Sequence, residues 1–302
     1  MTTTLDRPVK EPAFHPLSGR RKFTNALATV LVSAAVIIAL IPLVWVLYTV
    51  LDRGFDAILS ADWWFKSQNM MTNRIAGGGA YHAIIGTLFQ GLFCAVISVP
   101  IGIFVSIYLV EYGANSRLAK LTTFMVDILT GVPSIVAALL IYALWVATLG
   151  LPRSGLAVSL ALVLLMIPVV VRSSEEMLKI VPNDLREASY ALGVPKWKTI
   201  SRIVLPTALS GVVTGVMLAL ARVMGETAPL LVLVGYSKLI NYDMFGGEMA
   251  SLPGMMLDQR SGSVVGLAES RLWGAALTLI LLVAVLNVIA KLISRFFAPK
   301  KV

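Results

Sequence analysis

Long apolar runs alternate with short polar segments along most of this 302-residue chain. Six runs are long enough to cross a bilayer as helices, because about 20 apolar residues span the hydrocarbon at about 1.5 Å per residue. They cover roughly residues 26–50, 83–110, 120–149, 155–171, 207–235 and 272–293. The pattern therefore predicts an all-α, polytopic membrane protein with six transmembrane helices.

The two ends of the chain are polar and frame one membrane domain. We expect residues 1–25 to form a cytoplasmic N-terminal tail and residues 299–302 a cytoplasmic C-terminal tail, with a transmembrane domain over residues 26–298. The first apolar run is too long for the core of a secretory signal, which has about 7–15 residues.

Composition supports the membrane class and removes several others. Hydrophobic residues make up 58% of the chain and charged residues only 14%, whereas soluble domains are about 25% charged. The single cysteine, Cys94, can form no internal disulfide, and two histidines leave little for histidine catalysis or metal binding. No cofactor and no metal are expected.

The basic residues predict the orientation of the spans. With the N-terminus in the cytoplasm, seventeen Lys and Arg side chains lie inside and seven outside, while Arg222 lies within a span. This bias is the one that membrane proteins show. It also accounts for the net charge of +9, so no nucleic-acid partner is needed, and membrane lipid is the expected surrounding.

The longest cytoplasmic loop between spans, residues 172–206, predicts two short helices with a hinge between them. Pro182 suits the first turn of one helix, and Gly193 fits the left-handed position just past a helix end. Pro195 can open the second helix, and Pro206 is expected to break it before the fifth span.

Two interpretations of this loop remain open from its pattern. A basic amphipathic linker would lie on the lipid surface. A docking element for a cytoplasmic partner is the sharper alternative, and the mixture of Asp184, Arg186 and Glu187 in the first helix favours it, because this helix is not uniformly basic.

The order of residues in the loop resembles the EAA loop of ATP-binding-cassette importer permeases. That pattern is E-A-A, three residues, G, nine residues and I-x-L-P; here it is matched by Glu187-Ala188-Ser189, Gly193 and Ile203-Val204-Leu205-Pro206. Ser189 replaces an alanine of the pattern, and both spacings hold. The resemblance implies an ABC importer (type I) permease fold. It also implies that the loop contacts a cytoplasmic ATPase around Glu187, Ala188 and Gly193. The residues assigned to ATPase coupling are those that match the pattern: Glu187, Ala188, Ser189, Gly193, Leu205 and Pro206.

The chain contains no nucleotide-binding motif of the form G-x-x-x-x-G-K-[ST]. The triplet Gly77-Gly78-Gly79 lacks the Lys-Ser/Thr ending and is expected to lie outside. If ATP drives this protein, a separate subunit hydrolyses it, and the chain itself is not an enzyme.

Charges inside the membrane mark candidate functional residues. Arg222 and Glu226 fall in the predicted fifth span, where a charge costs at least about 2.5–3.5 kcal/mol. They continue a stripe of small residues, Gly211, Gly215 and Ala219, at helical spacing. Small residues let another backbone approach closely, so this face is expected to meet the protein interior or a partner rather than lipid.

A second polar stripe is predicted in the third span, where Thr123, Asp127, Thr130 and Ser134 recur at steps of three and four. For Arg222 and Glu226, one interpretation is a pair that neutralises itself and pins helices together. The other is an anion pathway, in which the Arg222 guanidinium offers a charged fork to an oxyanion. Glu226 would then hold the arginine and could accept a hydrogen from a protonated oxyanion.

The run "ARVMGETAPLL", residues 221–231, resembles the R-x-x-G-E-T-A-P-L signature of phosphate-importer permeases of the PstA type. The resemblance implies that Arg222, Glu226 and Thr227 lie along a phosphate pathway. Arg172 also matches an arginine of that family, although a basic residue at a cytoplasmic helix end is ordinary. Asp127 is a candidate only through its polar stripe.

The resemblance also implies the partners of the chain. These are a second homologous permease subunit (PstC type), a dimer of cytoplasmic ATP-binding subunits (PstB type) and an extracytoplasmic phosphate-binding protein (PstS type). The expected function is translocation of inorganic phosphate across the cytoplasmic (inner) membrane. An importer permease for another oxyanion or an organic solute is the nearest alternative. A proton-coupled secondary transporter, with Asp127 and Glu226 as the relay, is the alternative from another class.

Overall fold

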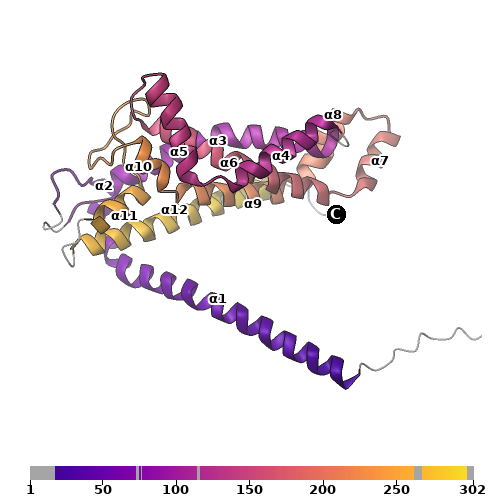
Figure 1. The fold of residues 1–302 in the computed structure, drawn as a ribbon, viewed down its shortest axis with the longest axis horizontal. Helices are drawn as coiled ribbons and strands as arrows, with labels where there is room; N and C mark the ends of the chain where they lie inside the picture. Colours follow the sequence, from indigo (N-terminus) through magenta and orange to yellow (C-terminus); the bar gives the residue numbers. More distant parts are fainter. Residues whose placement is uncertain (1–17, 73–74, 76, 114–115, 262–266, 298–302) are drawn as a thin grey trace, which may run out of the picture. The chain divides into compact units, whose positions relative to one another are not determined.

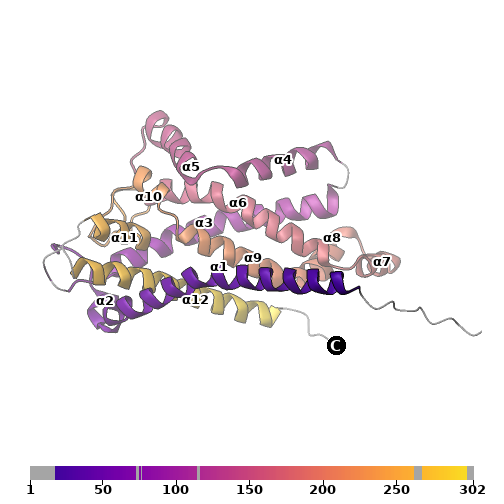
Figure 2. The ribbon, with the colours of Figure 1, turned by 60° about the horizontal axis from the view of Figure 1, so that its bottom comes forward.

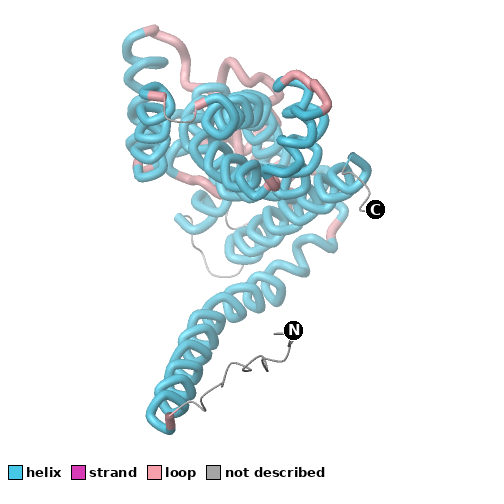
Figure 3. Tube along the Cα trace, turned by 90° about the vertical axis from the view of Figure 1, so that its right-hand side faces the viewer, coloured by secondary structure: helices cyan, strands magenta, loops and turns pink. Residues whose placement is uncertain are grey.

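The computed structural model describes residues 18–72, 75, 77–113, 116–261 and 267–297, and in this part of the chain every regular element is helical (Figures 1 and 3). In chain order the elements, with η marking a π-helical segment, are α1 (Gly19–Leu59), α2 (Ala61–Phe65), α3 (Tyr81–Ile107), η1 (Tyr108–Tyr112), α4 (Arg117–Gly131), α5 (Ser134–Ile141), η2 (Tyr142–Thr148), α6 (Gly155–Ile180), α7 (Asn183–Ala191), α8 (Lys196–Thr199), η3 (Ile200–Val204), α9 (Leu205–Met224), α10 (Ala228–Leu233), α11 (Leu252–Ser261) and α12 (Leu267–Phe297).

The chain divides into two compact units, Met1–Thr49 and Val50–Val302. Helix α1 starts at Gly19, so the end of the predicted N-terminal tail is helical and the first span is longer than expected. Residues 1–17 and 299–302 lie outside the described residues, and the predicted domain boundaries stay a prediction.

Five helices of the described residues are long and apolar enough to cross a membrane, and a bent pair raises the number to six. The single helices are Gly19–Leu59, Tyr81–Tyr112, Gly155–Ile180, Lys196–Met224 and Ala268–Arg295. The chain is therefore a multi-pass membrane protein with up to six spans, as its hydrophobic pattern predicts.

The predicted third span, residues 120–149, is wrong as a continuous helix. Helix α4 ends at Gly131, and the Ser134–Thr148 segment leaves it at an angle of 104°; Figure 2 shows α5 turning away from the line of α4. Val132 and Pro133 are both extended, with ψ angles of 126° and 138°. Proline disfavours helical geometry in the residue before it and has no N–H to continue the helix, which explains the break.

The predicted fifth span, residues 207–235, is displaced toward the N-terminus. One helix runs from Lys196 to Met224, and α10 is a separate short helix after Gly225. Pro206 does not break this helix, contrary to prediction. The π-helical segment η3 precedes it, with the Leu205 N–H bonded to the Ile200 carbonyl. A π-turn rearranges the hydrogen bonds just ahead of a proline that cannot donate one.

Helix α6 lies at the centre of the second unit. It packs between α3 and α9, and Figure 2 shows the three running side by side. Its N-terminal half is made of small and aliphatic residues that are buried nearly all round, which is the pattern of a fully enclosed helix. A Cβ on Gly102 of α3 would come within 2.6 Å of Val170, and one on Gly215 of α9 within 2.5 Å of Ser173. The helices therefore meet almost backbone to backbone.

Helix α6 also corrects the boundary of the cytoplasmic loop. The fourth span was predicted to end at residue 171, but α6 continues to Ile180. Residues 172–180 are thus helical, and the true connection between the long helices runs from Val181 to Pro195.

Candidate functional site

Arg222 and Glu226 do not form an ion pair in the part of the chain that the structure describes. Arg222 is exposed in the last turn of α9, and Glu226 is half-buried beyond Gly225. The Gly225 N–H donates to the Arg222 carbonyl (3.2 Å), and the Glu226 N–H donates to the Val223 carbonyl (3.1 Å). Because the helix ends between them, the predicted four-residue helical relation is lost. The Arg222 side chain is exposed and has no ion-pair partner among the described residues.

The small residues of the predicted stripe in α9 pack against a neighbouring helix, as expected, whereas the charged residue at the end of the stripe is exposed. Gly215 and Ala219 are buried, and a Cβ on Gly211 would come within 2.3 Å of Met177 of α6. The small residues therefore face α6, as the prediction of a close backbone approach requires. Arg222 does not share this buried seam, because its side chain is exposed.

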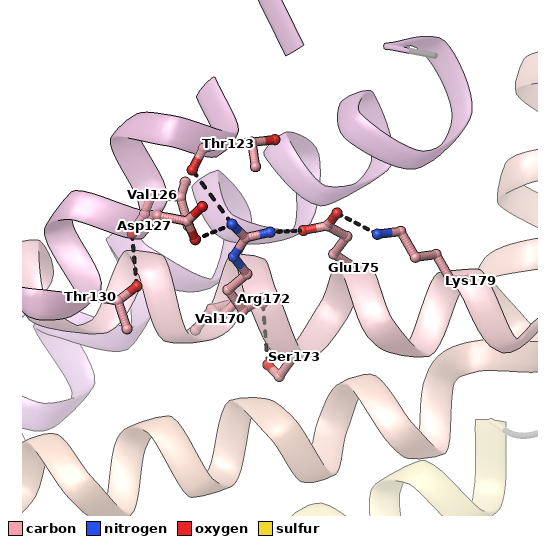
Figure 4. Close-up of polar contacts among 9 residues, drawn as sticks. All are labelled: Thr123, Val126, Asp127, Thr130, Val170, Arg172, Ser173, Glu175 and Lys179. Carbon is pink, nitrogen blue, oxygen red and sulfur yellow. Dashed lines mark hydrogen bonds and ion pairs between the residues drawn. The ribbon is translucent and has the colours of Figure 1, made fainter. Parts of the chain in front are cut away.

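A charged cluster joins α4 and α6 (Figure 4). The Arg172 guanidinium donates to Glu175 Oε2 at 2.8 Å, to the Thr123 carbonyl at 3.5 Å, and to Asp127 Oδ1, with which it forms an ion pair. Lys179 donates to the other Glu175 oxygen at 2.7 Å. Two of the sequence-predicted residues, Arg172 and Asp127, thus meet across 45 residues of sequence.

The third-span polar stripe is only partly formed. Thr123 and Asp127 face Arg172 (Figure 4), while the Thr130 hydroxyl donates to the Val126 carbonyl of its own helix (2.7 Å). Ser134 lies beyond the bend, in α5. The prediction that all four residues line one helix is therefore wrong, because the helix breaks at Val132 and Pro133.

A cavity of about 410 Å³ opens beside the charged cluster. Asp127, Glu175 and Lys179 line it together with Lys120 and Thr123. Both charge signs occur in this space, so an anion that enters it meets two lysines as well as the carboxylates that hold Arg172.

The first helix of the loop after α6 and its hinge have the predicted form, whereas the predicted second short helix is the start of the long helix Lys196–Met224. Pro182 caps α7, Gly193 has a φ of +73°, and Pro195 precedes α8. The Val194 N–H donates to the Ser189 carbonyl (3.1 Å) and the Gly193 N–H to the Tyr190 carbonyl (2.9 Å). A left-handed glycine at this place ends the helix and turns the chain back.

The residues matching the EAA pattern divide into exposed and anchoring positions. Glu187, Ala188 and Gly193 are exposed, whereas Ser189 is buried and its hydroxyl bonds Thr199 Oγ1 at 2.7 Å. Leu205 and Pro206 are half-buried within the long helix rather than in the loop. The same loop exposes large apolar side chains, among them Leu192 at 83% and Trp197 at 61%. Apolar groups exposed together with Glu187 suit a protein–protein contact.

Sequence reasoning missed Glu111 and Gln90, and it named Arg186 only as part of the mixed charge of the loop. Glu111 and Arg186 form a nearly buried ion pair with an Nη2–Oε1 distance of 2.8 Å. Gln90 is buried in α3, and its Nε2 has no hydrogen-bond partner among the described residues. It lines a cavity of about 10 Å³ together with Glu226. An amide inside an apolar run was the available signal for Gln90, and an acid closing such a run was the signal for Glu111.

A buried polar network ties together segments that connect the long helices at the other end of the second unit. The Tyr236 hydroxyl donates to Gln68 Oε1 (3.2 Å) and lies 3.1 Å from His82 Nε2, and the Gln259 amide also donates to Gln68 (3.3 Å). Burial, with Asp258 nearby, raises the pKa of the Tyr236 phenol well above its ordinary value, so the phenol stays neutral. The network fixes the connection between α2 and α3 against the segment that leads to α11.

Comparison with known proteins identifies a matching family and similar full-length relatives. The family described as "Binding-protein-dependent transport system inner membrane component" matches residues 98–302. The "Phosphate transport system permease protein PstA 1" of Mycobacterium tuberculosis (strain ATCC 25618 / H37Rv) is 53% identical over 297 residues, covering 98% of this chain and 96% of that protein. The PstA protein of Yersinia pestis is 40% identical over 281 residues, covering 93% and 92%.

Solved structures share the fold at low sequence identity. A structure titled as a bacterial ABC transporter involved in the import of the acidic polysaccharide alginate has a TM-score of 0.60 at 14% identity, covering 91% of this chain and 97% of that one. An inward-facing MetNI methionine ABC transporter has a TM-score of 0.56 at 20% identity, covering 73% and 94%.

The fold and the loop after α6 thus define a permease subunit of the type I ABC importer class. The chain belongs to the family of binding-protein-dependent transport system inner membrane components, and within it to the PstA-type permeases.

Proposed function

We propose that this chain forms half of a membrane pathway for inorganic phosphate, in an importer driven by ATP that a separate subunit hydrolyses. Its PstA-type relatives carry phosphate transport in their names. The observation that carries the proposal within this chain is Arg222, an exposed arginine of the R-x-x-G-E-T-A-P-L signature with no ion-pair partner among the described residues.

An unpaired guanidinium within a membrane span requires a counter-charge. Leaving a charge without a partner in an apolar environment is costly. A planar guanidinium with several N–H donors matches the oxygens of a phosphate, which it can bind through two parallel hydrogen bonds. Arg222 is therefore assigned to the substrate, with Glu226 and Thr227 directly beyond the helix end. Glu226 is assigned to limiting how tightly the anion is held.

Arg172 is assigned to a second position along the same path. Its guanidinium is held by Asp127 and Glu175 beside the 410 Å³ cavity. An anion that reaches this cavity competes with two carboxylates for the arginine. Such competition favours passage over retention, since a pathway needs weak, successive sites.

The exposed surfaces and the family support a proposal for the partners. A second, PstC-type permease would cover the open side of α9, and a dimer of PstB-type ATPases would receive α7 with Leu192 and Trp197. A PstS-type phosphate-binding protein would deliver the substrate on the opposite side. This assignment puts α7 and both termini in the cytoplasm, in agreement with the excess of Lys and Arg on that side. The protein would lie in the cytoplasmic membrane, and ATP hydrolysis would belong to the ATPase subunits.

Uptake by the reconstituted four-component complex tests the proposal. Radiolabelled phosphate and sulfate are offered to proteoliposomes with and without ATP. We expect ATP-dependent uptake of phosphate, and its loss in Arg222→Gln with unchanged assembly. Arg260→Gln, which alters an exposed arginine of α11, is the matched control and should transport normally.

The same experiment separates the alternatives. Phosphate uptake driven by a pH gradient without ATP would identify a secondary transporter instead. ATP-dependent uptake of sulfate but not phosphate would identify a permease for another oxyanion. Normal phosphate transport by Arg222→Gln would remove Arg222 from the pathway.

A further inference from the structure

Glu111 and Arg186 connect the loop helix α7 to the end of the span formed by α3 and η1. The Arg186 Nε and Nη2 atoms lie 3.0 and 2.8 Å from Glu111 Oε1. Only 12% of the arginine side chain and 4% of the glutamate side chain are exposed. The two residues are 75 positions apart in the sequence, so this ion pair is a tertiary contact and not a local helix pair.

The same guanidinium also binds the end of α6. Its Nη1 donates to the Val181 carbonyl at 2.6 Å, and its Nη2 donates to the Leu178 carbonyl at 3.0 Å. The last carbonyls of a helix lack partners within the helix and carry the negative end of its dipole. Arg186 belongs to α7, and its guanidinium binds both the carbonyls at the end of α6 and the carboxylate of Glu111 in η1. One side chain therefore joins three elements.

The second half of the loop is fastened to the same place. The Lys196 ammonium donates to the Glu111 carbonyl and lies 4.7 Å from the centre of the Tyr112 ring. Ser189 and Thr199, which bond each other, hold α7 against α8. At the tip, by contrast, a Cβ on Gly193 would meet nothing within 4 Å. The loop is therefore braced at its base on both sides of Gly193 and open at its tip.

A linker that only connected two helices would not need this arrangement. Burying two charges is costly, and removing one partner of a buried pair leaves an uncompensated charge, so such pairs are weak contributors to stability but strong constraints on geometry. The constraint here runs between α7, the proposed ATPase contact, and α3 and α6, which pack along each other in the core of the second unit. A displacement of α7 is thereby passed to the membrane helices.

We propose that Glu111 and Arg186 form the joint that transmits movement of α7 to α3 and α6, with Glu111 as a positioning residue for the coupling of ATP hydrolysis to transport. The inference rests on the proposed function for its driving partner. It adds a residue from outside the EAA pattern, and it places the joint in a buried charge pair rather than in the exposed docking surface.

The test uses the assembled importer in proteoliposomes and measures phosphate transported per ATP hydrolysed. Glu111→Gln keeps the shape of the side chain and removes its charge. We expect the complex to assemble and to hydrolyse ATP, while phosphate moved per ATP falls about fivefold or more, within the range of typical coupling free energies. Glu176→Gln, the same change at an exposed acid of α6 without an ion-pair partner among the described residues, is the control and should leave the ratio unchanged.

Arg186→Lys provides a second variant, in case Glu111→Gln fails to assemble. It keeps the charge but cannot reach the glutamate and both carbonyls at once, so its transport per ATP should fall between wild type and Glu111→Gln. A normal ratio in either assembled variant would overturn the proposal. Loss of the ATPase from both variants on purification would also overturn it, because the pair would then serve docking.

The outcome is separable from that of the proposed function. If the wild-type complex imports no phosphate, the proposed substrate is wrong. If the wild type imports phosphate and the variants match it, the joint alone is wrong.

Discussion

Arg172 of α6 is paired with Asp127 of α4, although the sequence named the two residues on separate grounds, Arg172 by a family resemblance and Asp127 by a polar stripe. The pair sits at the edge of a 410 Å³ cavity that also contains Glu175 and Lys179. Arg172 is thus occupied, while Arg222 has no ion-pair partner in the described part of the chain. The two candidate arginines differ in how an anion must engage them: one has to be released from a carboxylate, and the other does not.

We expect Asp127→Asn to lower the maximal rate of phosphate transport by about tenfold or more. A hydrogen bond to a charged group contributes about 1.5–3 kcal/mol, and an arginine without its carboxylate would retain the passing anion. Initial uptake rates against phosphate concentration measure the effect. Asp62→Asn, which breaks the exposed Asp62–Lys66 pair, should change nothing. An unchanged rate in Asp127→Asn would make the pair a clamp between α4 and α6 without a part in transport.

Gly193→Val should weaken the ATPase contact by altering the backbone. The φ of +73° costs a side chain with a Cβ roughly 1–2 kcal/mol, and nothing else obstructs it because no atom lies within 4 Å of the added carbon. Co-purification of the ATPase subunits from detergent measures the loss. Gly193→Asn should retain the contact, since asparagine adopts this conformation more readily. Equal loss in both variants would mean that any side chain at position 193 obstructs the ATPase, and that the backbone conformation is not the cause.

Gly215→Ala should destabilise the helix packing by about 1–3 kcal/mol, as overpacking in a closed interior does. The added carbon would lie 2.5 Å from both Cβ and Oγ of Ser173, so α9 must move away from α6. A lower midpoint in thermal unfolding of the purified chain is the expected observation. Gly131→Ala in α4 adds the same carbon where nothing lies within 4 Å, and its midpoint should stay the same or rise.

Gln90→Leu should stabilise the protein and impair transport. Replacing a buried amide whose nitrogen has no partner among the described residues removes a desolvation cost of about 1–3 kcal/mol. It also removes the polar group that shares the 10 Å³ cavity with Glu226, a space with room for at most one water. Thermal unfolding and phosphate uptake are measured on the same preparation. Gln259→Leu, which loses bonds to Gln68 and Asp258, should be less stable. A Gln90→Leu protein with normal uptake would separate Gln90 from Glu226.

Local signals in the sequence predict the parts of this protein that local chemistry decides. Pro182, Gly193 and Pro195 each have one strongly favoured backbone role, so the form of the loop after α6 follows from them. The small residues at 211 and 215 likewise predict a close helix contact, because only small residues allow it.

Sequence-based prediction fails where a residue type is compatible with more than one local structure, or where a contact joins distant residues. Pro133 breaks its helix and Pro206 does not, because the π-turn of η3 rearranges the hydrogen bonds ahead of Pro206, whereas Val132 and Pro133 are extended. The pair of Glu111 and Arg186 depends on residues 75 positions apart, and no local pattern joins them. The end of α9 at Met224 was hidden by the apolar run that continues beyond it.

The close approach of α3, α6 and α9 limits how the protein can change shape. At Gly102 and Gly215 there is no room for even a methyl group between neighbours, so these helices cannot slide past one another without lifting apart. They have to tilt as one solid block. In the proposed importer, exposure of the pathway first to one side and then to the other would therefore come from rocking this block against the proposed second permease, with the hinge outside it.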